Sequence, residues 1–390
     1  MSQLKVNTIR HTGASSDAIT LANDGTATAR ITNNLSNRQI NMNGAMRVSQ
    51  RGTSFSFAHD GTTSGYTIDR FKYTMTSCDS YDCTVTQDSS GPDGFSKSLK
   101  VTTGTAESAI AAGEYSYIDT RLEGWDVQHL NYGDADAKAT LGSFWVKSSV
   151  TGTFGFSIYR GEGTDRIINV PYAISSANTW EKKTLAINGD TAQAVGDVST
   201  EKLRLMWTLW AGTGMTSAGA SNTWTNYSGD ATKFQAGHVT NTLATTAGAT
   251  FYLTGVQFEV DNGSGVATDF EHRRYIAEFN RCQRYYFVAC KGDNVPFCAG
   301  ESHNGSQFVG FIKYPTEMRA TPTLKHNDGT SYYQCYGNST SDNCDSVGTS
   351  RNCPTGFVVA LSGNLSLTQG TGTYARTANA SALIAFDAEL

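Results

Sequence analysis

Short alternating runs of apolar and polar residues fill the middle of the chain. Several of these runs are rich in β-branched and aromatic residues, and turns that contain Gly, Ser or Asn separate most of them. No helical period competes with this alternation. The pattern predicts antiparallel strands packed as a two-sheet sandwich, with a jelly roll as the favoured form, over residues 46–268. The clearest predicted strands are residues 141–148, 153–160, 167–174, 180–187, 203–211 and 249–260.

The first 45 residues alternate in the same way, but their runs are short, polar and interrupted by turns. Val6 and Ile9, then Ile19 and Leu21, are the apolar positions of this pattern. Strands of this length cannot bury a core alone. We therefore expect residues 1–45 to be a strand-rich segment that serves oligomerisation or attachment to another protein. A flexible tail is the alternative in the isolated chain.

A helical period appears after Asp269 and predicts a helix over residues 269–287. Tyr275, Ile276 and Phe279 follow an i, i+1, i+4 spacing within it. Asp269 is the predicted N-cap, because its carboxylate can accept hydrogen bonds from the first free N–H groups. Aromatic residues occupy more than one face of this helix. We therefore expect Tyr275, Ile276 and Phe279 to contact neighbouring copies of the chain in a parallel homotrimer.

Residues 288–390 return to short strands and are predicted to form a smaller β domain, so that the helix links two β domains. Asn-Asp-Gly at 327–329 predicts a hairpin turn within it. The predicted strands lie in residues 285–290, 308–315, 332–337, 355–363 and 382–390.

Composition supports this all-β class and excludes several kinds of partner. The chain has 39 Gly, only 6 Pro and 17% charged residues, which favours strands and loops over helices. The net charge of −5, without a basic stretch, argues against nucleic acid as a partner. The N-terminus lacks the features of a signal peptide, and no apolar run approaches membrane-spanning length. We expect synthesis in a cytoplasm without membrane insertion.

Eight cysteines are present, but their spacing does not predict a metal site. None forms a CxxC pair, and no His lies at zinc-ligand spacing from them. Buried or free thiols are the favoured interpretation. Disulfides that close in an oxidising medium are the alternative, with Cys78–Cys83 and a pair among Cys335, Cys344 and Cys353 as the candidates. We expect no cofactor. Ca²⁺ held by loop carboxylates is compatible with a jelly roll, although no spacing here requires it.

Three motifs follow one another within residues 251–287. They are Gly-Val-Gln-Phe-Glu at 255–259, Ala-Thr-Asp-Phe-Glu-His-Arg at 267–273 and Cys-Gln-Arg-Tyr-Tyr at 282–286. This stretch resembles the joint found in many structural proteins of tailed bacteriophages, especially those of marine bacteria and cyanobacteria. Weaker similarity lies in residues 41–55, 313–324 and 387–390. The sequence departs from the pattern at residues 78–83 and in the cysteine-rich segment 335–353.

The resemblance implies a tail fibre or other virion appendage, made in the host cytoplasm and assembled as a homotrimer with a carbohydrate-binding-like jelly roll. Its implied partners are other virion tail or adaptor proteins and a host surface polysaccharide. The motifs mark architecture and identify no ligand residues.

No arrangement of residues predicts catalysis. Acidic pairs such as Asp134 and Asp136 lie where turns favour Asp, and no β-helix period of the kind found in polysaccharide-cleaving tailspikes is present. No Gly-x-Ser-x-Gly lies between a strand and a helix, and the His residues are scattered. We expect a non-enzymatic protein. A polysaccharide depolymerase is the less favoured alternative.

Glycan binding is the favoured function, because sugar rings pack their C–H faces on aromatic side chains. Two of the candidate contacts flank the loop 126–131, and the others border the long polar loop 211–248. The candidates are Trp125, Tyr132, Trp210, Trp224 and Tyr227.

Other interpretations of the aromatic residues stay open. Trp145, Trp180 and Trp207 lie inside predicted strands and are assigned to the core. The C-terminal domain, with Tyr332 to Tyr336, is the alternative receptor site. The alternative for the whole protein is a purely structural spacer, adaptor or capsid-decorating fibre.

Overall fold

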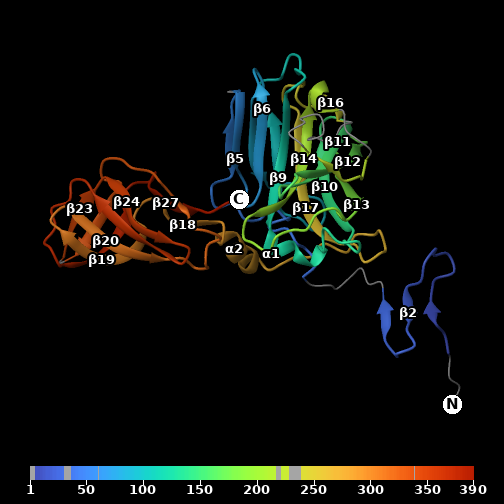
Figure 1. The fold of residues 1–390 in the computed structure, drawn as a ribbon. Helices are drawn as coiled ribbons and strands as arrows, with labels where there is room; N and C mark the ends of the chain where they lie inside the picture. The colour runs from blue at the N-terminus through green and yellow to red at the C-terminus, as the bar shows by residue number, and fades with distance from the viewer. Residues whose placement is uncertain (1–4, 30–36, 60, 217–220, 228–238, 338) are drawn as a thin grey trace.

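The computed structural model describes residues 5–29, 37–59, 61–216, 221–227, 239–337 and 339–390. Almost all of the regular structure in these ranges is antiparallel β-sheet, so the predicted all-β sandwich is confirmed. The chain forms a small N-terminal sheet, a large jelly roll and a C-terminal β domain (Figure 1). Within the described ranges, no helix has the length and apolar character needed to cross a bilayer.

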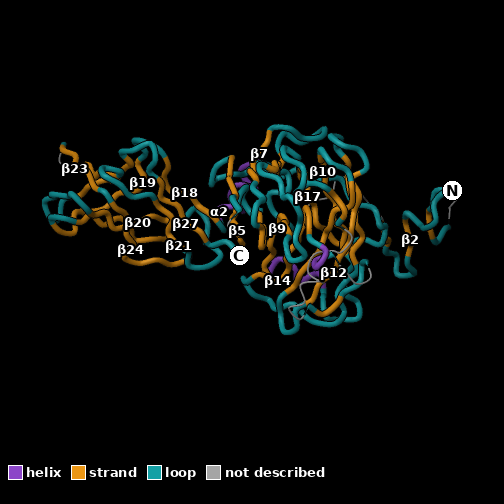
Figure 2. Tube along the Cα trace, turned by 90° about the horizontal axis from the view of Figure 1, so that it is seen from above, coloured by secondary structure: helices purple, strands orange, loops and turns teal. Residues whose placement is uncertain are grey.

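Two sheets form the jelly roll. The first has the order β13 (Glu181–Ile187), β10 (Thr140–Ser148), β17 (Thr250–Val260), β8 (Ser98–Thr103), β7 (Cys83–Asp88) and β4 (Ser54–Phe57). The second has the order β15 (Thr225–Asn226), β12 (Arg166–Ile174), β11 (Gly152–Arg160), β14 (Glu201–Ala211), β9 (Tyr115–Glu123), β6 (Lys72–Cys78) and β5 (Gly61–Tyr66), and β16 (Thr240–Asn241) pairs with β11. In Figure 2 the strands labelled β7 and β10 lie on one side of the sandwich, and β12 and β14 on the other.

The jelly-roll core forms where the inward residues of the two sheets meet. Phe144 of β10, Phe156 of β11 and Trp207 of β14 are buried, with ring centroids 5.2 to 5.9 Å apart. Alternate residues of a strand point to opposite faces, so a strand with one buried face shows a period of two in its sequence. The six clearest predicted strands are confirmed as β10, β11, β12, β13, β14 and β17.

The N-terminal sheet has little to bury. It consists of β1 (Thr8–Ile9), β2 (Ile19–Leu21) and β3 (Ala27–Ala29), and it lies apart from the jelly roll in Figure 1. Val6, Ile9 and Leu21 remain exposed. A sheet of this size has no core of its own, and its role in attachment or oligomerisation stays a prediction.

The linking helix is shorter than predicted. Helix α2 spans Tyr275–Gln283, and Arg274 takes the N-cap position, so the predicted cap at Asp269 is wrong. The residues before the helix run across the outside of the first sheet instead. There Thr268 donates through its backbone N–H to Glu259 (2.8 Å), and Glu271 donates to the Gln257 side chain (2.8 Å). A short helical turn, α1 (Gly124–Val127) with η1 (Gln128–Leu130), was not predicted, and η2 covers Thr213–Met215.

The C-terminal domain contains two sheets. One has the order β18 (Tyr286–Lys291), β27 (Leu383–Asp387) and β21 (Thr323–His326). The other has the order β23 (Thr340–Cys344), β22 (Tyr333–Gly337), β26 (Gly372–Thr377), β19 (Pro296–Asn304), β20 (Gln307–Lys313), β25 (Gly356–Ser362) and β24 (Ser346–Cys353).

The hairpin turn predicted at residues 327–329 is wrong. The strands on either side of it, β21 and β22, belong to different sheets. The Asp328 carboxylate instead accepts a hydrogen bond from the backbone of Val347 (3.0 Å), and the Gly329 N–H donates to Asp345 (3.0 Å). This segment therefore crosses from one sheet to the other.

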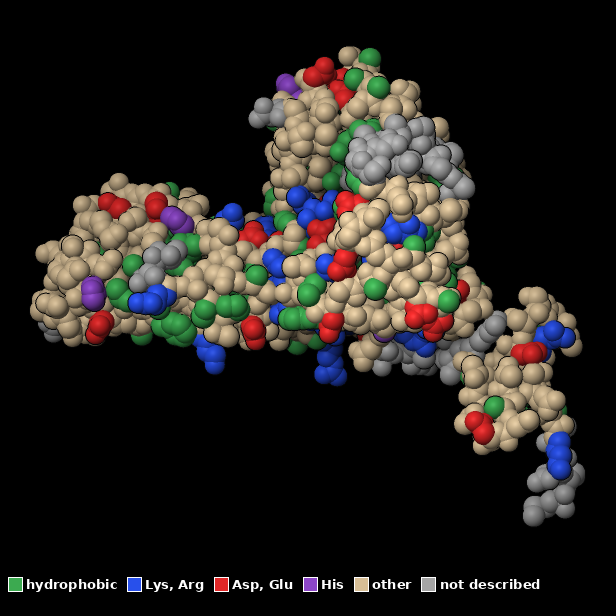
Figure 3. Space-filling view, in the orientation of Figure 1, with side chains coloured by type: hydrophobic (Ala, Val, Ile, Leu, Met, Phe, Trp, Pro, Cys, Tyr) green, Lys and Arg blue, Asp and Glu red, His purple; other side chains and the backbone are tan. Residues whose placement is uncertain are grey.

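Buried charges join the C-terminal domain to the jelly roll. Glu389 pairs with Arg70, which is almost fully buried and stacks on Tyr285 at 3.4 Å from the ring centroid. Arg51 reaches Glu389 at 3.3 Å and covers the ring of Tyr286 at 3.7 Å. Charged side chains of both signs gather beside this junction in Figure 3. Each buried charge at this junction therefore has a partner of opposite sign, which offsets the free energy of its desolvation.

Asp69 gives this junction a testable pH dependence. The carboxyl is buried, and burial raises its pKa to about 6, above the ordinary 3.8. The folded state therefore binds a proton more readily than the unfolded chain, and this group lowers the stability as the pH rises from about 4 to about 6, by up to ~3 kcal/mol. The stability of the wild type relative to Asp69→Asn should fall across this window, as measured by urea unfolding.

The exposed Asp197→Asn variant is the matched control for the loss of one carboxylate. A wild-type advantage over Asp69→Asn that grows with pH would show that Arg51, 4.0 Å away, outweighs burial.

Candidate functional site

Two of the five predicted glycan contacts are buried in the jelly-roll core. Trp210 is fully buried and packs edge-on against Tyr81 with ring centroids 5.0 Å apart. Tyr132 is 5% exposed and packs edge-on against Trp224 at 5.9 Å. Neither Trp210 nor Tyr132 offers a ring face to a ligand in this structure, which corrects the sequence-based assignment.

The other three candidates do not lie together. Trp125 is exposed on α1, with the guanidinium of Arg284 5.6 Å from its ring. Trp224 donates its indole N–H to the backbone of Asn188 (2.7 Å). Tyr227 packs against Tyr159 on the outer side of the second sheet, at 5.9 Å. Trp224 and Tyr227 belong to the loop 211–248, of which residues 217–220 and 228–238 lie outside the described residues.

A different set of aromatic residues gathers on the outer side of the first sheet. Trp145 of β10 is half-buried, whereas its neighbours Phe144 and Val146 point into the core. Tyr252 of β17 lies between the buried Phe251 and Leu253, so it also points outward. Trp180 precedes β13 and lies against Tyr252, with ring centroids 5.9 Å apart. We call Trp145, Trp180 and Tyr252 the aromatic face.

Lysines stand among these rings. The ammonium group of Lys147 lies 5.0 Å from the ring centroid of Trp180 and 4.1 Å from that of Tyr252, and that of Lys100 lies 5.3 Å from Tyr252. Lys182 pairs with Trp145 across β13 and β10 and is exposed. Cation–π attraction holds the ammonium groups of Lys147 and Lys100 near the rings, and Lys147 also donates to the Ser90 hydroxyl (3.1 Å).

Gly255 lies beside Trp145, at the edge of the aromatic face. Its φ is +61°, and a Cβ at this position would come within 2.9 Å of both Phe95 and Trp145. The ladder between β10 and β17 is irregular beside it, between Ser143 and Trp145. Only glycine combines this backbone conformation with such close ring contact. The motif glycine at 255 therefore positions Trp145.

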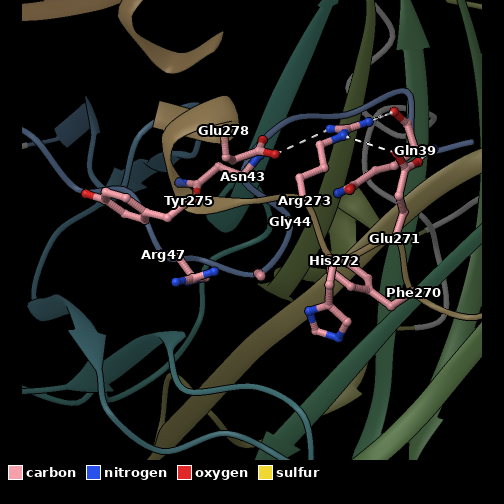
Figure 4. Close-up of a pocket in the computed structure, with 11 residues that line it drawn as sticks. Gln39, Asn43, Gly44, Arg47, Phe270, Glu271, His272, Arg273, Tyr275 and Glu278 are labelled. Carbon is pink, nitrogen blue, oxygen red and sulfur yellow. Dashed lines mark hydrogen bonds and ion pairs between the residues drawn. The ribbon is translucent and has the colours of Figure 1, made fainter. Parts of the chain in front are cut away.

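The small pocket of Figure 4 belongs to the joint between residues 39–47 and the segment that leads into α2. Arg273 bonds the backbone of Gln39 and pairs with Glu278 at 3.5 Å, as the dashed lines show. The pocket volume is about 20 Å³, room for no more than a single water molecule. Its polar groups bond one another and hold residues 39–47 against the segment before α2.

A wider hollow of about 340 Å³ adjoins this joint, between Arg47, Phe95 and His272. Burial, with the nearby charge of Arg47, lowers the pKa of His272. The hollow shares Phe95 with the edge of the aromatic face, so the two lie on one continuous surface.

The C-terminal domain carries a polar hollow of about 300 Å³. Ser and Thr hydroxyl groups make up most of its lining, and the carboxylate of Asp342 also lines it. The hydroxyls of Ser302 and Thr373 are buried there and have no hydrogen-bond partner among the described residues. Tyr333 is fully buried beneath this domain's surface, and Tyr336 stays exposed and packs on Tyr374 at 5.3 Å. This hollow is the second surface that fits a hydroxyl-rich ligand.

The predicted oligomer contacts are accessible on α2. Tyr275 is 46% exposed and Ile276 61% exposed, while Phe279 is half-buried and stacks on Tyr275 at 5.9 Å. All eight cysteines are free thiols in the structure.

Comparison with known proteins identifies no family: no family model matches the chain, and neither does any curated protein. Among solved structures, a protein from Bacteroides thetaiotaomicron that is assigned as sugar-binding shares 9% identity with this chain. The match covers 57% of this chain and 100% of that protein, with a TM-score of 0.30. The CBM22-1 xylan-binding domain of Paenibacillus barcinonensis Xyn10C shares 13% identity over 57% and 94%, with a TM-score of 0.27. A family 11 carbohydrate-binding module of Clostridium thermocellum shares 13% identity over 59% and 96%, with a TM-score of 0.23. Likeness at this level carries no argument about what this chain binds.

Proposed function

We propose that this chain is a tail-fibre-like virion appendage of a tailed bacteriophage and that its aromatic face binds a host surface glycan. The observation that carries the binding proposal is the set of three outward aromatic rings with lysines among them. Sugar rings pack their C–H faces on aromatic rings, and ammonium groups donate hydrogen bonds to hydroxyl and acid oxygens. The phage assignment rests on the resemblance of residues 251–287 and their flanking motifs.

The same surface favours an acidic glycan. Lys100, Lys147 and Lys182 stand beside the rings, and Asp88 is the carboxylate that faces Lys100, at 3.8 Å. Attraction between exposed charges weakens with salt, so the affinity for an acidic polysaccharide should depend on ionic strength more than that for a neutral one.

Binding can be tested on an array of acidic and neutral bacterial surface polysaccharides. Trp180→Ala should weaken binding roughly tenfold or more, equivalent to about 1.4 kcal/mol, because it removes half of the Trp180–Tyr252 platform. Trp125→Ala is the matched control, since it removes an exposed indole away from the aromatic face.

Loss of binding in Trp125→Ala but not in Trp180→Ala would move the site to the loop predicted from the sequence. Loss only on changing Asp342 would move it to the C-terminal hollow. Unchanged binding by all three variants would refute the aromatic face as the site, and absence of binding by the wild type itself would leave a spacer as the function.

The virion assignment has a separate test. Antibodies raised against the purified chain should label the tails of intact phage particles in electron micrographs, because an appendage is exposed on the assembled virion. Labelling confined to the capsid would favour a capsid-decorating fibre. Particles without any label would refute a virion appendage.

We also propose that the chain assembles as a homotrimer through α2, because an exposed Tyr275 and Ile276 on one short helix form an apolar surface next to Arg47. Light scattering should give three times the 41.9 kDa chain mass. Tyr275→Asp should return a monomer with unchanged circular dichroism, because it places a charge in the contact. Val198→Asp, at another exposed apolar position, should stay trimeric. A wild-type monomer at micromolar concentration would refute the assembly.

A further inference from the structure

Three carboxylates converge at one end of the jelly roll. Asp79 lies in the turn between β6 and β7, and Glu107 and Glu114 lie between β8 and β9. One oxygen from each of the three lies within 4.8 Å of the others. Glu107 and Glu114 are each 2% exposed, whereas Asp79 is open to solvent. We call these residues the acidic triad.

The described residues give the acidic triad no cationic partner. Oε1 of Glu107 accepts hydrogen bonds from the Ser80 hydroxyl (2.6 Å) and the Ser108 backbone (3.1 Å). Its Oε2 is buried and has no hydrogen-bond partner among the described residues. No ion pair from a Lys or Arg within the described ranges reaches the triad. A buried carboxylate oxygen with neither a donor nor a counter-charge is costly.

The second buried carboxylate adds to the repulsion. Oε2 of Glu114 accepts a hydrogen bond from the backbone of Ala111 (2.7 Å). Burial raises the pKa of Glu114, and the negative charges of Glu107 and Asp79 raise it further. A single proton would neutralise one of the three groups and leave two negative charges close together. A divalent cation would neutralise two charges and can be bound by one oxygen from each residue.

We propose that the acidic triad binds a structural Ca²⁺ ion. Ca²⁺ takes oxygen ligands at about 2.3–2.6 Å, so three carboxylate oxygens that lie within 4.8 Å of one another can share one ion. Ca²⁺ also accepts irregular geometry and completes its shell with water, which can enter on the open side at Asp79. Mg²⁺ demands near-octahedral geometry and retains several waters, so a site built on two buried carboxylates suits it less well.

The ion would link the two sheets of the jelly roll at this end of the sandwich. Strands β6 and β7, on either side of Asp79, belong to different sheets. Tyr81 in the same turn is fully buried against Trp210, so the turn is already anchored to the core. A cation between Asp79, Glu107 and Glu114 would hold this turn to the segment that enters β9 and stabilise the end of the sandwich.

Calorimetry of metal-free protein tests this site. Millimolar CaCl2 should raise the melting temperature of the jelly roll by ~5 °C, through preferential binding to the folded state. Glu107→Gln should lose this rise, because the neutral amide removes a ligand charge. Its metal-free melting temperature should equal or exceed that of the metal-free wild type, since the substitution also removes repulsion. Asp197→Asn should respond to Ca²⁺ as the wild type does.

Each contrary result overturns a defined part of the inference. Absence of Ca²⁺ binding to the metal-free wild type by titration calorimetry at millimolar concentration would refute the site. A Ca²⁺ response retained in Glu107→Gln would place the ion elsewhere. An equal rise with MgCl2 would refute the assignment to Ca²⁺. Stabilisation on acidification to pH 5, with no effect of Ca²⁺ at pH 7.5, would show a resident proton instead.

Discussion

The buried ion pair between Arg70 and Glu389 is the contact on which the arrangement of the two β domains depends. Both side chains are almost completely removed from water, so the loss of either one would leave a buried charge without its main partner. Arg70 comes from the jelly roll and Glu389 follows the last strand of the C-terminal domain. Tyr285 covers the guanidinium of Arg70, and Arg51 supplies a second cation to Glu389. The C-terminal domain is thereby held at one position against the jelly roll, whatever its own loops contain.

The motifs that resemble phage structural proteins lie where segments of the chain meet. The Asn41 amide donates to the backbone of Val256 and accepts from Phe258, Glu271 accepts from the backbone of Gln39, and Asn43 bonds Glu278 of α2. These contacts seat residues 37–46 beside β17 and α2. Side-chain amides and carboxylates suit this task, because they satisfy backbone groups that no strand partner reaches. Most of the motif residues therefore form a joint, whereas Gly255 borders the aromatic face through its contact with Trp145.

Local periodicity was enough to predict six strands of the jelly roll, because one buried face imposes a period of two over each of these segments. It could also have placed Trp145 outside, since Phe144 and Val146 flank it. Trp210 was misassigned because the end of β14 looks like the edge of a loop, although tertiary packing buries it under Tyr81. The predicted cap at Asp269 is wrong for a similar reason. The Gln257 side chain on β17 accepts a hydrogen bond from the backbone N–H of Glu271, so this backbone does not begin a helix. Asp79, Glu107 and Glu114 share no local spacing, and strand pairing alone brings them together.

The open form of the aromatic face has a kinetic consequence for the proposed binding. Trp145, Trp180 and Tyr252 lie on the outside of a sheet, half-exposed, so no rearrangement of the chain has to precede contact. Encounter should then be fast and assisted by the lysine charges, while a shallow contact gives a short residence time at each site. A particle that carries many such faces would release and rebind them one at a time. It could move across a polysaccharide layer without detaching, and search a cell surface by diffusion in two dimensions rather than three.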